Sequence, residues 1–142
     1  MSESADYKAF KNHVITPRDR LDRIENCMIP GMPDTNICID GVESWIELKS
    51  PKEPKRSTTN LFGSNHPLSQ DQMNWLLRQR NARGRAHVLI VTDARWLLID
   101  GKHGDVINDL TVTELIAIAE WHATKPIRSK EEWKRLRTLL QQ

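Results

Sequence analysis

Apolar residues recur at helical spacing in the first part of the chain. In residues 4–14 they lie three and four positions apart, an amphipathic pattern that predicts a helix. Thr16 and Pro17 then have the order of a helix N-cap followed by proline at the first helical position. We therefore expect a second helix over residues 17–26, ending before Gly31.

Two short apolar segments separated by a turn signal come next. Residues 37–39 and 43–50 have the pattern of strands, and Asp40-Gly41 between them favours a tight hairpin turn. Residues 51–67 form a long connection rich in proline, serine, threonine, asparagine and lysine. A connection of this length in a small domain is usually functional or flexible. We expect it to be mobile without substrate and to lie against the substrate when bound.

The second half of the chain alternates between the same two patterns. Residues 69–83 predict a helix, and residues 87–91 form a nearly continuous apolar run, as in a strand covered on both faces. Residues 96–99 predict a further strand, and helices begin at the capping box of Thr111 and at Ser129. This order of elements indicates a mixed α/β domain, with a central sheet flanked by helices.

Composition agrees with a globular domain. Of the 142 residues, 38% are hydrophobic and 28% are charged, and a domain of this size can bury enough surface to fold. No apolar run approaches the roughly 20 residues that span a bilayer, and the first residues lack a secretory pattern. We expect a cytoplasmic protein with no membrane contact. Cys27 and Cys38 show no metal-ligand spacing and are expected to be reduced thiols partly in the core.

Two acids and one lysine have the placement of a metal-dependent hydrolytic site. Glu47 and Lys49 alternate along one strand and so share a face, while Asp34 leads the preceding strand of the hairpin. A lone carboxylate between apolar neighbours, as Glu47 is, is costly to bury unless it is paired or binds a metal. Mg²⁺ takes oxygen ligands and keeps waters for chemistry. Two structural alternatives stay open, because Asp34 can form an Asx turn and Glu47 can pair with Lys49 alone.

These residues resemble the signature of the PD-(D/E)XK nuclease superfamily, in which proline-aspartate precedes Glu-x-Lys. The chain reads Gly31-Met32-Pro33-Asp34, Glu47-Leu48-Lys49 and Leu68-Ser69-Gln70-Asp71-Gln72-Met73-Asn74-Trp75-Leu76. The segments are most similar to the VRR-NUC group and to archaeal and phage Holliday junction resolvases. The resemblance covers about residues 16–100 and implies a restriction-endonuclease-like core. Residues 110–142 would be a C-terminal helical extension of a single nuclease domain, 1–142.

The resemblance also implies roles for individual residues. Asp34 and Glu47 would bind Mg²⁺, with Mn²⁺ as a substitute, together with the backbone carbonyl of Leu48. Lys49 would orient or deprotonate the attacking water. Resolvase-type members carry a fourth acid on the helix before the proline-aspartate, which is expected here at Glu25.

Two further assignments stay open. Asp22 is the second choice for the fourth acid. Gln72 completes a capping box with Ser69, and the resemblance alternatively implies that it contacts metal-bound water or phosphate. The histidines show no close pairing, and His66, in the long connection, is the one that merits a test. The tryptophans are expected to pack in the core rather than to stack on bases.

Basic residues gather in three places although the formal net charge is only +2. They follow the Glu-x-Lys strand, crowd the end of the 69–83 helix and fill the C-terminal segment. Each cluster alone is usually a solvated surface. Beside an acidic metal centre, they favour a phosphate backbone as the ligand. The residues expected to contact nucleic acid are Lys52, Lys55, Arg56, Arg78, Arg83 and Arg85.

These observations predict a Mg²⁺-dependent endonuclease that hydrolyses phosphodiester bonds in branched DNA such as Holliday junctions. A homodimer is expected, because junction resolution needs two symmetric cuts. The resemblance, together with the small size, is compatible with a bacteriophage or other mobile-element origin, which would place a phage-encoded protein in the host cytoplasm. Two alternatives remain: a nuclease for flap, mismatched, nicked or foreign DNA, and a nucleic-acid-binding module without catalysis.

Overall fold

The computed structural model describes residues 3–25, 28–63 and 66–142. Its centre is a single six-stranded sheet in which the strands lie side by side in chain order. The strands are β1 (Arg20–Arg23), β2 (Thr35–Ile39), β3 (Val42–Lys49), β4 (Ala86–Val91), β5 (Arg95–Asp100) and β6 (Trp121–Thr124). Only the central pair, β3 and β4, is parallel; the other neighbouring pairs are antiparallel. The parallel pair requires a crossover, which contains helix α2 (Gln70–Asn81).

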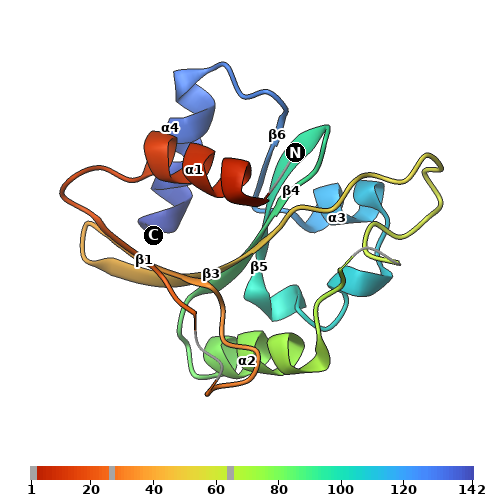
Figure 1. Cartoon of the computed structure of the whole chain (residues 1–142), viewed down its shortest axis with the longest axis horizontal. Coiled ribbons are helices and arrows are strands. Elements are labelled where there is room, and N and C mark those ends of the chain that lie inside the picture. The colour runs from red at the N-terminus through yellow and green to blue at the C-terminus, as the bar shows by residue number, and fades with distance from the viewer. Residues whose placement is uncertain (1–2, 26–27, 64–65) are drawn as a thin grey trace.

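Helices cover both faces of the sheet (Figure 1). Helices α1 (Glu3–Val14) and α4 (Lys130–Leu140) lie on one face, and α2 and α3 (Val112–Ile118) lie on the other. Two short 3₁₀ helices, η1 (Gly101–His103) and η2 (Ile107–Asp109), connect β5 to α3. The predicted α/β class, with a mixed sheet flanked by helices, is confirmed.

The apolar core beneath α1 and α4 joins the two ends of the chain. Phe10 of α1 and Leu136 of α4 are buried in one cluster with Ile46 and Leu48 of β3. The C-terminal helix therefore packs on the same sheet as the N-terminal helix. Residues 110–142 also supply the edge strand β6, so they extend the sheet as well as adding helices.

A second core fills the opposite face. Leu76 of α2 and Leu115 of α3 are buried against Val88 and Ile90 of β4. All six residues of β4 are buried, as expected for a strand covered on both faces. Alternation along the strands assigns each side chain to a face, so even-numbered residues of β3 point toward α1 and odd-numbered ones toward α2.

The helix predicted over residues 17–26 is wrong for the part that the structure describes. Residues 20–23 form β1, which pairs with β2 so that Leu21 lies opposite Ile37. Asp19 does accept hydrogen bonds from the backbone and hydroxyl of Thr16, at 2.8 and 2.9 Å, but this closes a single turn. The edge of β2 that is not paired with β3 offers backbone hydrogen-bonding groups, and residues 20–23 pair with them as a strand. No local sequence pattern reveals this partner. Asn26 lies outside the described residues, as does Cys27.

The remaining predicted elements are confirmed with small shifts in their ends. The capping boxes at Ser69 and Thr111 begin α2 and α3, and Ser129 caps α4. Strand β6 was not predicted, because its four residues carry too little pattern to identify. The long connection is anchored by Leu61 and Phe62, each 1% exposed. Its mobility stays a prediction. Among the described residues, no helix has the length and apolar character needed to cross a bilayer.

Candidate active site

The antiparallel pairing of β2 and β3 brings the two predicted acids together. Thr35 lies opposite Ile46, so in the same register Asp34, one residue before β2, lies opposite Glu47. Ile46 is buried under α1, and therefore Glu47 and Lys49 point to the other face of the sheet, toward α2. Two carboxylates from separate strands and one ammonium group thus meet on one face of β2 and β3.

The bend before Asp34 depends on a glycine. Gly31 has φ +79°, in the left-handed region, and a Cβ built on it would lie 2.1 Å from the backbone oxygen of Asp71 in the first turn of α2. Only a residue without a side chain allows this approach. The Gly-x-Pro-Asp sequence therefore holds the entrance of β2 against α2.

Burial and nearby negative charges raise the pKa of both carboxyls. Glu47 is 6% exposed, and its pKa rises from 4.5 to about 8 because of burial first and the charge of Asp34 second. The positive charge of Lys49 and a hydrogen bond from the backbone of Asp34 oppose this rise. Burial also raises the pKa of Asp34, against a 3.0 Å hydrogen bond from the Thr35 hydroxyl and one from the Leu48 backbone. The charge of Asp34 thus acts on Glu47, while the Asx-turn alternative for Asp34 stays untested.

The donor set suits a hydrated hard cation. The described residues contain no group of three or more histidine, cysteine, aspartate or glutamate side chains arranged to hold a metal. Asp34 and Glu47 supply two carboxylates, which is the usual protein contribution to a Mg²⁺ site that keeps several waters. The Leu48 carbonyl lies in β3 between Glu47 and Lys49, where it was predicted to be a third ligand. A divalent cation would offset the negative charges of Glu3 and, for Glu47, of Asp34 that help to raise these pKa values.

Glu3 is a third acid near this centre, and sequence reasoning missed it. It lies at the start of α1, and its charge raises the pKa of both Asp34 and Glu47. Arg23 of β1 links Glu3 to the centre: its guanidinium is 3.1 Å from a Glu3 oxygen and 4.0 Å from an Asp34 oxygen. The spacing of apolar residues predicts the helix that carries Glu3. That pattern does not predict where the start of this helix lies relative to β3.

Glu25 and Asp22 do not lie on a helix, as the prediction for the fourth acid required. Glu25 is exposed in the segment after β1, and among the described contacts none joins it to Asp34 or Glu47. Asp22 is exposed in β1, where it pairs with Arg20 at 2.5 Å. The assumption that a helix would turn an acid toward Asp34 fails because β2 recruits this segment as a strand.

Gln72 forms the capping box of α2. Its side-chain oxygen accepts a hydrogen bond from the backbone of Ser69 at 2.9 Å, and its own backbone donates to the Ser69 hydroxyl at 3.1 Å. The structural interpretation is thereby confirmed. A contact with metal-bound water or phosphate stays a prediction for this residue.

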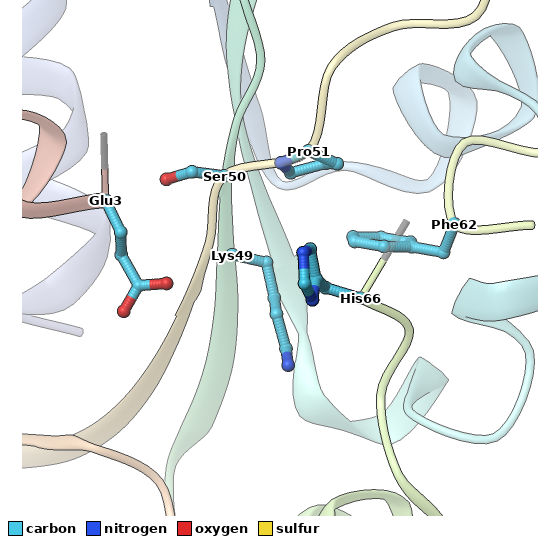
Figure 2. A pocket seen from close by; sticks show the side chains of 6 residues that line it. All are labelled: Glu3, Lys49, Ser50, Pro51, Phe62 and His66. Atoms are coloured by element: carbon cyan, nitrogen blue, oxygen red, sulfur yellow. The ribbon is translucent and has the colours of Figure 1, made fainter. Parts of the chain in front are cut away.

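A pocket of about 330 Å³ opens beside Lys49. Figure 2 shows the Lys49 side chain between Glu3 on one side and His66 on the other. The residues that line the pocket are Glu3, Lys49, Ser50, Pro51, Phe62 and His66. The pocket thus joins α1, the end of β3 and the connection 51–67.

Five of the six predicted nucleic-acid contacts are exposed, and one is not. Lys52, Lys55 and Arg56 lie exposed in the connection after β3, and Arg78 and Arg83 are exposed on or just after α2.

Arg85 is partly buried, and its guanidinium donates to the backbone oxygen of Leu139 in α4 at 3.1 Å. Burial lowers the pKa of Arg85. Its side chain therefore ties the residue just before β4 to α4, which sequence spacing within the basic cluster did not reveal.

Comparison with known proteins gives little further guidance. No family model matches the chain, and no curated protein matches it. Among solved structures, Hjc, a Holliday junction resolvase from the archaeal hyperthermophile Archaeoglobus fulgidus, is similar in fold. The match has 16% sequence identity and a TM-score of 0.49, and it covers 70% of this chain and 77% of that chain. A likeness this weak carries no information about what this chain binds or cleaves.

Proposed function

We propose that the protein is a divalent-metal-dependent endodeoxyribonuclease, with Mg²⁺ as its ion and Mn²⁺ as a substitute. The observation that carries this proposal is the pairing of Asp34 with Glu47 on the face that also presents Lys49. One buried and one partly buried carboxyl, both with raised pKa values, form a site that favours a cation, and such sites are concentrated where chemistry occurs.

Each residue has a distinct role in the proposed hydrolysis. Asp34, Glu47 and the Leu48 carbonyl would hold the ion, and its chemistry there would be to acidify a water and to offset charge on the phosphate. Lys49 extends from the same face toward the adjoining pocket, where it orients the water and stabilises the negative charge that develops on the phosphate oxygens. The alternative in which Glu47 only pairs with Lys49 does not account for the position of Asp34.

Branched DNA is the substrate that we propose, because the three sequence segments resemble those of Holliday junction resolvases. Lys52, Lys55 and Arg56, which follow β3 directly, would contact phosphates on the way to the pocket. Two symmetric cuts require two identical sites, so the active form would be a homodimer. Light scattering that finds only monomer at assay concentration would contradict this part of the proposal.

Cleavage of a synthetic four-way junction with Mg²⁺ tests the function directly. Linear duplex and flap substrates of the same sequence serve as comparisons. Lys49→Ala is expected to lower the cleavage rate by about 10²-fold or more, because it removes charge stabilisation from the transition state. Lys102→Ala, at an exposed lysine of η1, is the matched control and is expected to cleave at the wild-type rate. Equal rates for Lys49→Ala and wild type would refute the assigned centre.

A binding module without catalysis is the second candidate, favoured by the attraction between Glu47 and Lys49. It predicts DNA binding with no metal binding that depends on the two acids. Calorimetric titration of Mn²⁺ into wild type and Asp34→Asn separates the two, because the nuclease proposal requires binding that the variant loses.

A further inference from the structure

His66 lies at the pocket beside Lys49, although it is far from the Glu-x-Lys strand in sequence. It shares the pocket lining with Lys49, Ser50 and Phe62. Figure 2 shows its ring next to the Lys49 side chain, with the Phe62 ring beyond it. The two charged groups that share this pocket with His66 are Lys49 and Glu3. A phosphate bound at Lys49 in this pocket would therefore lie beside the imidazole.

The segment around His66 is held on both sides. Phe62 before it is 1% exposed and Leu68 after it is 2% exposed. The side chain of Asn108 in η2 forms two hydrogen bonds with the backbone of Leu68. Its oxygen accepts from the Leu68 N–H at 2.9 Å, and its amide nitrogen donates to the Leu68 carbonyl oxygen at 2.8 Å. His66 itself has φ +43° and is exposed, so its ring is presented to solvent two residues before the anchored Leu68.

The arrangement matches the needs of an in-line displacement. Attacking and leaving oxygens lie on opposite sides of the phosphorus in such a reaction. Glu3, whose charge acts on Asp34 and Glu47, lies on one side of Lys49, and His66 lies on the other. A phosphate bound at Lys49 and attacked from the side away from His66 would direct its departing oxygen toward the imidazole.

We propose that His66 is a catalytic residue that donates a proton to the departing ester oxygen. This inference rests on the proposed nuclease function. Water attacks phosphorus and forms a new P–O bond, the bond to the ester oxygen breaks, and that oxygen keeps the electron pair and takes the proton from the imidazolium. The attacking water loses its own proton to solvent, and the exposed imidazole is protonated again from solvent. Imidazole suits this task because it exchanges protons near neutral pH.

The test compares oxygen and sulfur leaving groups. Once the wild-type cleavage position is mapped, two DNA substrates are made, with oxygen or sulfur as the bridging atom that departs. Rates are measured under single-turnover conditions with Mn²⁺ for wild type, His66→Ala and His66→Asn. Asparagine tolerates the left-handed conformation and forms hydrogen bonds, but it is not a proton donor of this kind. His122→Ala, at an exposed histidine of β6 outside the pocket, is the matched control.

Both His66 variants are expected to cleave the oxygen substrate about 10²-fold more slowly than wild type, and the sulfur substrate at nearly the wild-type rate. A thiolate departs without protonation, so the missing donor has no effect there. Equal loss on both substrates, or no loss on either, would overturn the proposed role. His66→Asn activity equal to wild type would overturn it as well. Absence of cleavage by wild type on any DNA would instead refute the proposed function itself.

Discussion

Replacing Glu47 with glutamine should stabilise the metal-free protein at alkaline pH and not at acidic pH. Glutamine keeps the shape of the side chain but removes the charge. The pKa of Glu47 rises from 4.5 to about 8 on folding, chiefly through burial. Each tenfold change in an acid constant is worth about 1.4 kcal/mol, so the buried, ionised carboxylate costs at most about 5 kcal/mol.

The sign of the pH dependence follows from proton binding. Between pH 4.5 and about pH 8 the folded protein holds a proton on Glu47 that the unfolded chain releases. Raising the pH through this window therefore lowers the free energy of unfolding, and above it the loss is constant. The carboxyl of Asp34, whose pKa is also raised, acts in the same direction.

Urea unfolding in the presence of a chelator at about pH 5 and about pH 8.5 measures the effect. The free energy of unfolding of Glu47→Gln should exceed that of wild type only slightly at the lower pH. At the higher pH this difference should grow by several kcal/mol. Excess Mg²⁺ at the higher pH should then stabilise wild type but not the variant, because binding to the folded state alone shifts unfolding. An identical difference at both pH values would refute the argument that burial and Asp34 hold this carboxyl in its protonated form.

Two further predictions concern the frame around the site. Gly31→Ala should lower the free energy of unfolding by about 2–4 kcal/mol, since a Cβ there meets the Asp71 backbone. Gly41→Ala, which also has a positive φ but open space around it, is the control in urea unfolding, and an equal loss would contradict the close-contact argument. Asp19→Asn should cost about 1–2 kcal/mol at neutral pH, because a hydrogen bond from Arg137 first, and others from Thr16, lower the pKa of Asp19 to about 2. That cost should disappear as the pH falls from about 4 to 2, and a cost that persists at low pH would count against the ion pair.

The residues that sequence predicted well are those governed by local rules. Glu47 and Lys49 share a face because side chains alternate along any strand. The hairpin at Asp40-Gly41 and the capping boxes at Ser69 and Thr111 follow from turn and cap chemistry confined to four or five residues. These features required no knowledge of distant parts of the chain.

The features that sequence missed depend on partners far away in the chain. Residues 20–23 became a strand because β2 offered a free edge, which outweighed the helix signal at Thr16. Glu3 approaches the carboxylates because α1 packs across the sheet with α4, and Arg85 is occupied by the backbone of Leu139.

The sequence by itself determined the local elements and the order in which Asp34, Glu47 and Lys49 occur. Tertiary structure alone decided that Glu3 lies on one side of Lys49 and His66 on the other. The reason is physical: alternation and capping act over a few residues, whereas burial and charge repulsion depend on which segments pack together. The pKa of Glu47, about 8, is a property of that packing.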